Sequence, residues 1–212
     1  MPAFLLKETE MANTLGKTEI CNIALRRIGV NPINNVESDV SAAAMELRSM
    51  WDLTVENVLR SAEWSFARKV IPLAEVGDEK SLGWDYLYKY PADCSIMWHI
   101  ENESSIHNPD IKNKWEKLLS PVTNTPCIAC DVAEAYGIYT ARITDPVLWD
   151  EMFVDALAWK LASEVCQRLA SDTSLWNRCS TMYRSAIVTA QTMNKTENGT
   201  DDALQGAFIT CR

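Results

Sequence analysis

The sequence predicts a mainly α fold of the α+β class: a four-helix bundle layer that carries an inserted antiparallel β lobe and an extended C-terminal tail. Apolar residues recur at helical spacing in 18–64 and 145–195, which together form the predicted bundle. Between them, residues 65–144 form short runs rich in aromatic and β-branched residues, separated by Gly, Pro and Asp. Residues 1–17 and 196–212 are predicted as an N-terminal extension and a tail.

Two helices are expected before the β lobe. The stretch "TEICNIALRRIG" predicts the first helix, with Thr18 as its cap and Gly29 as its stop signal. The second helix is expected to begin after Ser38, whose hydroxyl can accept a hydrogen bond from an early backbone N–H. It extends for about 24 residues, or roughly 36 Å at the usual helical rise. Its apolar stripe comprises Val40, Ala44, Leu47, Trp51, Val55, Val58 and Ala62.

Several short segments of the β lobe are expected to form strands. Their lengths and spacing predict an antiparallel sheet or a small barrel rather than parallel strands joined by helices. Pro72 has no backbone N–H to donate, so the first segment is expected at a sheet edge. The segments are 65–76, 85–90, 94–101, 113–119, 127–132 and 136–144.

The helical pattern returns after the β lobe. Asp145 is the expected cap of the third helix and Pro146 its first residue, while the last helix follows Asp172. Apolar residues cover about half of the third helix, more than one partner helix would bury, so this arc is a candidate for part of a subunit interface. The arc comprises Met152, Val154, Leu157, Ala158, Trp159, Leu161, Val165 and Leu169.

The stretch "LRSAEWSFAR" marks the end of the second helix and the start of the β lobe. Trp64 and Phe66 are two residues apart, so on an emerging strand both side chains would point the same way. We therefore expect these two aromatic residues to form a junction between the bundle and the lobe.

The formal net charge of −9, from 20 Lys and Arg against 29 Asp and Glu, restricts the possible partners. A protein that grips nucleic acid through its phosphates needs a basic face, which argues against a DNA clamp. An acidic surface is compatible with a conduit along which DNA slides. No apolar run approaches the roughly 18 residues of a membrane span, and the N-terminus lacks an export pattern, so neither a membrane partner nor export is expected.

No enzyme activity, catalytic residue, metal or cofactor is expected. The sequence has only two histidines and contains no Gly-rich phosphate loop, GxSxG or HExxH motif. One alternative is a small thiol or zinc module at Cys127 and Cys130, in "PCIAC". A structural zinc site needs four ligands, however, and no second pair at a suitable spacing follows. Another alternative is a soluble helical scaffold that binds a cellular partner.

Five stretches, taken in order, resemble the head-to-tail adaptor of short-tailed bacteriophages, of the tail tubular protein A type. The likeness covers about residues 18–190, and all of its motifs concern packing or junctions rather than chemistry. The stretches are "TEICNIALRRIGVNPI", "VESDVSAA", "LRSAEWSFAR", "YLYKYPADC" and "DEMFVDALAWKLASEV".

The resemblance implies a structural virion protein, assembled in the host cytoplasm and located in the neck of the virion. It implies a homo-oligomeric twelvefold ring that joins the portal protein to the tail nozzle protein, with DNA passing through the lumen without specific binding. We expect acidic residues to face this lumen; the candidates are Glu46, Asp52, Glu56 and Glu63. The tail has apolar residues suited to docking on the portal; these are Ala203, Leu204, Phe208 and Ile209.

Overall fold

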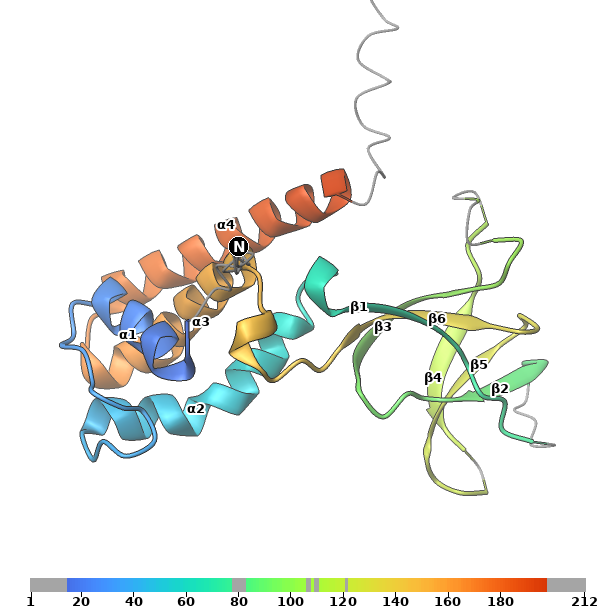
Figure 1. The fold of residues 1–212 in the computed structure, drawn as a ribbon, viewed down its shortest axis with the longest axis horizontal. Helices are drawn as coiled ribbons and strands as arrows, with labels where there is room; N and C mark the ends of the chain where they lie inside the picture. The colour runs from blue at the N-terminus through green and yellow to red at the C-terminus, as the bar shows by residue number, and fades with distance from the viewer. Residues whose placement is uncertain (1–14, 78–82, 106–107, 109–110, 121, 198–212) are drawn as a thin grey trace, which may run out of the picture. The chain divides into compact units, whose positions relative to one another are not determined.

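The computed structural model shows an α+β fold that is mainly α, as predicted (Figure 1). Within the described residues there are four α-helices and two antiparallel sheets of three strands each. No described helix combines the length and the apolar character that a membrane span requires. The structure describes residues 15–77, 83–105, 108, 111–120 and 122–197.

The chain divides into two compact units, each built from two segments. The helical unit contains the described residues up to Val55 together with Ile143–Ala186. The strand unit contains Glu56–Arg142 together with the described residues from Ile187 onward.

The boundaries of these units fall inside two helices. The predicted divisions follow residues 64, 144 and 195, whereas the structure divides after Val55, Arg142 and Ala186. The last part of α2 (Ala42–Leu59) and the last part of α4 (Thr173–Glu197) therefore belong with the strands.

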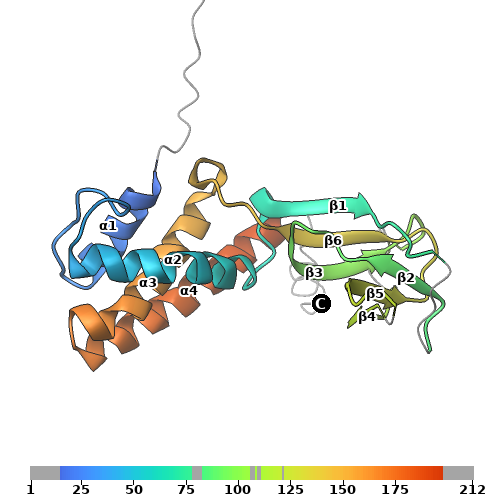
Figure 2. The same cartoon turned by 90° about the horizontal axis from the view of Figure 1, so that it is seen from below.

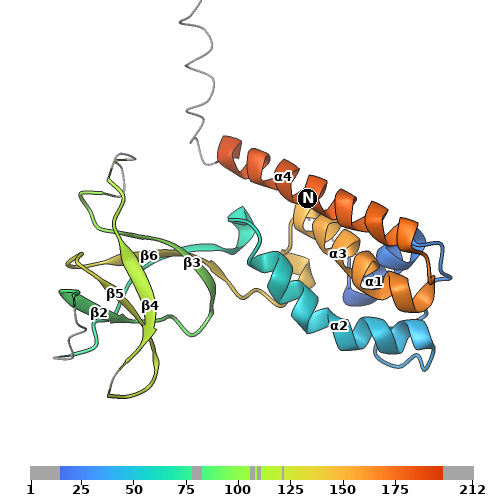
Figure 3. The same cartoon turned by 180° about the vertical axis from the view of Figure 1, so that it is seen from behind.

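The helical unit is organised around α3 (Glu151–Leu169), which packs most closely against α1 (Lys17–Arg27). In Figures 1 and 3, α3 lies between the parts of α2 and α4 that belong to this unit, and Figure 2 shows α1 to one side of them. Because α3 has neighbours on several sides, most of its wide apolar arc is buried. The prediction that this arc forms part of a subunit interface is therefore wrong for these residues, which form the core of the helical unit. The buried members of the arc are Val154, Leu157, Ala158, Leu161 and Val165.

The third helix begins later than predicted. Asp145 does act as a cap, since its side chain accepts a hydrogen bond from the backbone N–H of Val147 at 3.1 Å. The element it starts is only a 3-10 helix, η2 (Pro146–Leu148). Asp150 caps α3 itself by accepting from the N–H of Phe153 at 2.6 Å. The predicted single helix is therefore two elements.

The first two helices also differ from the prediction at their starts. Gly16 is the N-cap residue of α1, while the Thr18 hydroxyl accepts a hydrogen bond from the N–H of Val36 at 3.2 Å. Helix α2 begins at Ala42 after Ser41, whose hydroxyl oxygen accepts from the N–H of Ala44 at 3.3 Å. It has 18 residues, fewer than expected, because an Asx turn extends the preceding loop and the helix already ends at Leu59.

The strand unit holds both sheets. In the first, β6 lies between β1 and β3 (Figure 2); in the second, β5 lies between β2 and β4. Pro72 ends the edge strand β1, as predicted. The strands are β1 (Arg68–Pro72), β2 (Tyr86–Lys89), β3 (Cys94–Glu101), β4 (Trp115–Leu119), β5 (Pro126–Cys130) and β6 (Tyr136–Ala141).

A glycine in β6 permits close packing within this unit. Gly137 pairs in register with Ile71 on one side and Ile100 on the other. A Cβ atom at this position would lie 2.9 Å from the Leu73 side chain and 3.1 Å from that of Met97. Position 137 therefore accepts no side chain without displacing its neighbours.

Candidate functional site

The described cysteines do not form a chemical site. Cys127 and Cys130 are both buried in β5 and are three residues apart, so their side chains leave opposite faces of the strand. Cys127 packs in an apolar cluster with Leu87 and Ala129. Burial raises the pKa of the Cys130 thiol. In the part of the chain that the structure describes, no cluster of His, Cys, Asp and Glu side chains could hold a metal ion. This geometry gives the thiol or zinc module no support.

Three of the four acidic lumen candidates have a basic side chain of the same chain as a partner, an arginine for two of them and a histidine for the third. Glu46 lies 3.3 Å from Arg168 in the helical unit. In the strand unit, Glu56 pairs with Arg142 at 3.0 Å and Glu63 lies 3.2 Å from His99. Asp52 is exposed on α2. Whether any of these carboxylates faces a DNA channel stays a prediction.

Glu56 is the centre of a polar network between α2 and the first sheet. Arg142 donates to both of its carboxylate oxygens, at 3.0 and 3.3 Å, and the Ser95 hydroxyl donates to Oε1 at 2.9 Å. The Arg60 guanidinium donates to the carbonyl oxygen of Ser95. The hydrogen bonds from Arg142 are the main reason that the pKa of Glu56 is lowered. This residue therefore acts as a structural acid within the strand unit.

Replacing Glu56 by glutamine should destabilise the protein in a pH-dependent way. The Arg142 side chain is 48% exposed, so solvent screening limits the expected loss at pH 7 to about 1 kcal/mol. Because folding lowers the pKa of Glu56, its contribution is present above the unfolded-state value near 4.5 and is lost as the pH falls through the folded-state value. Denaturant unfolding of parent and variant across this range would measure the difference.

Glu103→Gln is the matched control, because the Glu103 side chain is exposed. It should leave the free energy of unfolding unchanged at every pH. A Glu56→Gln effect that stayed constant down to about pH 3 would show that the charge of Glu56 is not the source of its contribution.

Trp64 and Phe66 do not emerge on a strand as predicted. Trp64 precedes a 3-10 turn, η1 (Ser65–Ala67), that contains Phe66, and β1 begins only at Arg68. Trp64 is fully buried and its indole N–H donates to the carbonyl oxygen of Val58 at 2.9 Å. The two rings are 6.3 Å apart and tilted by 45°. Both residues belong to the strand unit; their role as a junction stays a prediction.

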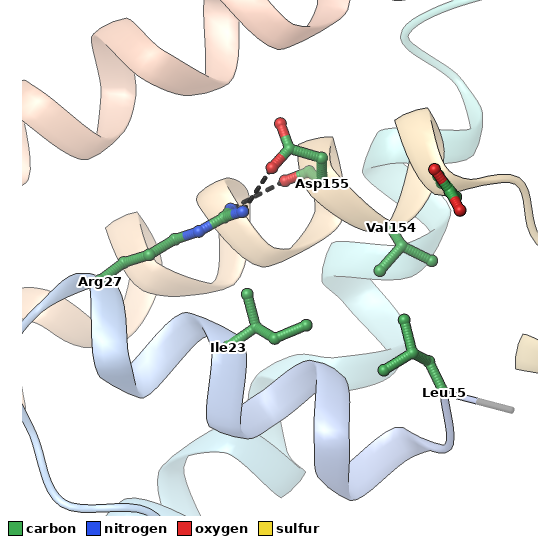
Figure 4. A pocket seen from close by; sticks show the side chains of 6 residues that line it. Leu15, Ile23, Arg27, Val154 and Asp155 are labelled. Atoms are coloured by element: carbon green, nitrogen blue, oxygen red, sulfur yellow. Dashed lines mark hydrogen bonds and ion pairs between the residues drawn. The ribbon is translucent and has the colours of Figure 1, made fainter. Parts of the chain in front are cut away.

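A small cleft of about 230 Å³ lies beside α1 and α3 in the helical unit (Figure 4). Arg27 reaches from α1 to Asp155, donating to its carboxylate and, at 2.9 Å, to its carbonyl oxygen. The guanidinium also lies over the Trp159 ring, 4.0 Å from its centroid. The Arg27 guanidinium is therefore already paired with Asp155 and stacked on Trp159. Burial lowers the pKa of Arg27. The cleft is lined by Leu15, Ile23, Arg27, Glu151, Val154 and Asp155.

The helical unit exposes apolar side chains on both of its outer helices. On α2, Met45 and Leu53 are 53% and 58% exposed. Their spacing places them on one side of the helix together with Asp52. We call this side the α2 face, and define it by Met45, Ser49, Asp52 and Leu53.

The outer side of α4 carries the opposite charge. Its exposed apolar side chains in the helical unit are Trp176 at 37% and Met182 at 40%. Arg178 and Arg184 are also exposed there. The helix has no acidic residue between Thr173 and Asn194. Only Arg178 and Met182 lie on the same side of the helix, whereas Trp176 and Arg184 point in other directions. We define the α4 face by Arg178 and Met182. Sequence reasoning missed both faces: Met45 and Leu53 lie outside the apolar stripe predicted for the second helix, and Met182 was taken as part of the stripe of the last helix.

The tail residues predicted to dock on the portal lie outside the described residues; they are Ala203, Leu204, Phe208 and Ile209. No protein-family model matches the chain, and no curated protein matches it in sequence.

Proposed function

We propose that this chain is one subunit of a ring-forming adaptor that joins the portal vertex of a short-tailed bacteriophage to its tail. The ring surrounds the channel through which DNA leaves the head. The ordered resemblance along residues 18–190 supports this proposal, as does a fold class that agrees with the helical bundle and inserted β lobe that the resemblance implies.

The observation that carries the proposal is the pair of exposed helix faces on the helical unit. A closed ring of identical subunits needs two different surfaces on each subunit, because every contact is made between unlike faces. The helices α2 and α4, which carry these faces, lie on opposite sides of α3 in Figures 1 and 3. Both expose apolar area, and they differ in charge, with Asp52 on one and Arg178 on the other. In the proposed ring, the α4 face of one subunit contacts the α2 face of the next.

This arrangement refines the expected roles of the acidic residues. Asp52 faces a neighbouring subunit instead of the lumen. Glu46 and Glu56 are already paired with arginines, so they contribute less negative potential to a channel wall than unpaired carboxylates would. The low affinity of the ring for DNA rests on the net charge of −9 per chain, with no basic face required.

Charge reversal on the α4 face tests the proposed ring. The chain would be mixed with the portal protein of a short-tailed phage, and assembly would be followed by electron microscopy and mass photometry. Arg178→Glu places a like charge opposite Asp52, so we expect the concentration needed for assembly to rise about tenfold. Adding Asp52→Arg to that variant should restore assembly.

Arg26→Glu is the matched control, since Arg26 is exposed on α1 and the change in net charge is the same. It should assemble like the parent. If the parent neither forms rings nor binds any such portal, the proposed function is wrong. The alternative, a soluble helical scaffold that binds a cellular partner, would then be favoured. If rings form but Arg178→Glu assembles normally, only the assignment of the two faces fails.

A further inference from the structure

The end of α4 is attached to the strand unit by the side chain of Asn194. This amide is only 9% exposed although it lies near the end of a long helix. Its Nδ2 donates to the carbonyl oxygen of Glu63 at 2.7 Å, and its Oδ1 accepts from the Ser65 hydroxyl at 3.0 Å. Both hydrogen-bonding ends of one amide are thus used on a segment 129 to 131 residues away in sequence.

A second amide supports the same contact from the preceding turn of α4. Gln191 Nε2 donates to the carbonyl oxygen of Ser61 at 3.2 Å. Gln191 and Asn194 are three residues apart, so they lie on one side of the helix. Together they span the connection 61–65, which joins α2 to β1.

The connection 61–65 is also held from its other side by β3. Glu63 pairs with His99 at 3.2 Å, and Arg60, next to the connection, donates to the carbonyl oxygen of Ser95. Trp64 fixes the middle of the segment, since it is fully buried with its indole N–H bonded to Val58. The connection and the residue before it therefore contact both α4 and the first sheet.

We propose that Asn194 and Gln191 form a clasp that makes the end of α4 and the connection 61–65 open and close as one unit. A helix end has carbonyl groups without partners in the helix and normally frays independently of the rest of the protein. Here the α4 end cannot separate without leaving the part-buried carbonyl of Glu63 and the hydroxyl of Ser65 without their amide partner. A displacement of the α4 end is thereby transmitted through residue 63 to β3. This inference does not depend on the proposed function.

Hydrogen exchange of backbone amides tests the clasp. In Asn194→Ala we expect exchange to accelerate about tenfold in 187–194 and also in 61–67, while 174–186 keeps its parental rates. Alanine is the better helix former, so a residue that served only the helix would lose no protection on this change. In Ser65→Ala, exchange at 187–194 should accelerate as well, because coupling between two sites acts in both directions.

Two further variants make the result decisive. Asn177→Ala changes an exposed asparagine on the same helix and should alter no exchange rate. Asn194→Asp keeps the size and the acceptor for Ser65 but removes the donor to Glu63, so it should accelerate exchange in 61–67. If Asn194→Ala and Ser65→Ala each changed only their own segment, the two segments would open independently and the clasp would be refuted.

Discussion

Replacing Trp64 by alanine is expected to lower the free energy of unfolding by about 3–5 kcal/mol, the cost typical of removing a large buried aromatic side chain. Trp64 is among the largest fully buried side chains of the described chain. The change would leave a cavity beside Phe66 and remove the hydrogen bond from the indole to the carbonyl oxygen of Val58. Denaturant unfolding monitored by circular dichroism would measure the loss.

Trp64→Phe separates packing from hydrogen bonding. It keeps most of the aromatic contact with Phe66 and loses only the N–H donor, so it should cost about 1–2 kcal/mol. A Trp64→Ala variant as stable as the parent would contradict the buried position of this ring. Equal losses for the two variants would show that the hydrogen bond, and not the packing, stabilises this site.

Replacing Phe153 by alanine should have an effect of similar size, about 3–5 kcal/mol, in the helical unit. Phe153 is fully buried on α3, and its ring meets that of Trp149 edge to face at 4.9 Å. Trp149 in turn stacks on Trp51 of α2 at 6.0 Å and donates its indole N–H to Ile143. Loss of the Phe153 ring therefore weakens an aromatic cluster that joins α2, η2 and α3.

Phe153→Leu provides the control for this change. Leucine fills most of the space, so we expect a loss of less than about 1.5 kcal/mol. Thermal unfolding of both variants, followed by circular dichroism, would measure the two losses. If Phe153→Ala unfolded at the parental temperature, Phe153 would not belong to the core of this unit.

The fold class could be predicted because the spacing of apolar residues and the positions of turn-forming residues are local properties of the chain. Each of the six strands lies within or overlaps a predicted segment; β3, for example, occupies 94–101 as expected. Pro72 indicated a sheet edge for a similar reason: proline has no backbone N–H to donate to a neighbouring strand, and this is a property of the single residue. The pairing of strands into two sheets could not be predicted, because it depends on contacts between distant segments.

Helix starts were predicted less well because several residues near each start can serve as caps. Asp145 and Asp150 both accept hydrogen bonds from nearby backbone N–H groups, but only Asp150 begins an α-helix. Ser38 and Ser41 offered the same ambiguity before α2. Packing decides which of two nearby capping residues begins the α-helix. Here Trp149, which lies between Asp145 and Asp150 in the sequence, is buried in the core.

The candidate sites depended on tertiary contacts even more strongly. The width of the apolar arc on α3 was visible in the sequence, but the number of elements around α3 was not. Glu56 could be placed on the outside of α2, yet its partner Arg142 is 86 residues away. The signal for Asn194 was weaker still, since a single asparagine near the end of a polar helix is typical of an exposed surface.

The burial of the cysteines makes each one a reporter of motion in its own element. The six described cysteines are free and buried, and burial raises the pKa of Cys21 in α1 to about 12. Such thiols react with alkylating reagents only when the surrounding structure opens. Their positions sample α1, β3, β5, α3 and α4, so mass spectrometry of alkylated protein would follow the opening of each element without any introduced label. The six are Cys21, Cys94, Cys127, Cys130, Cys166 and Cys179.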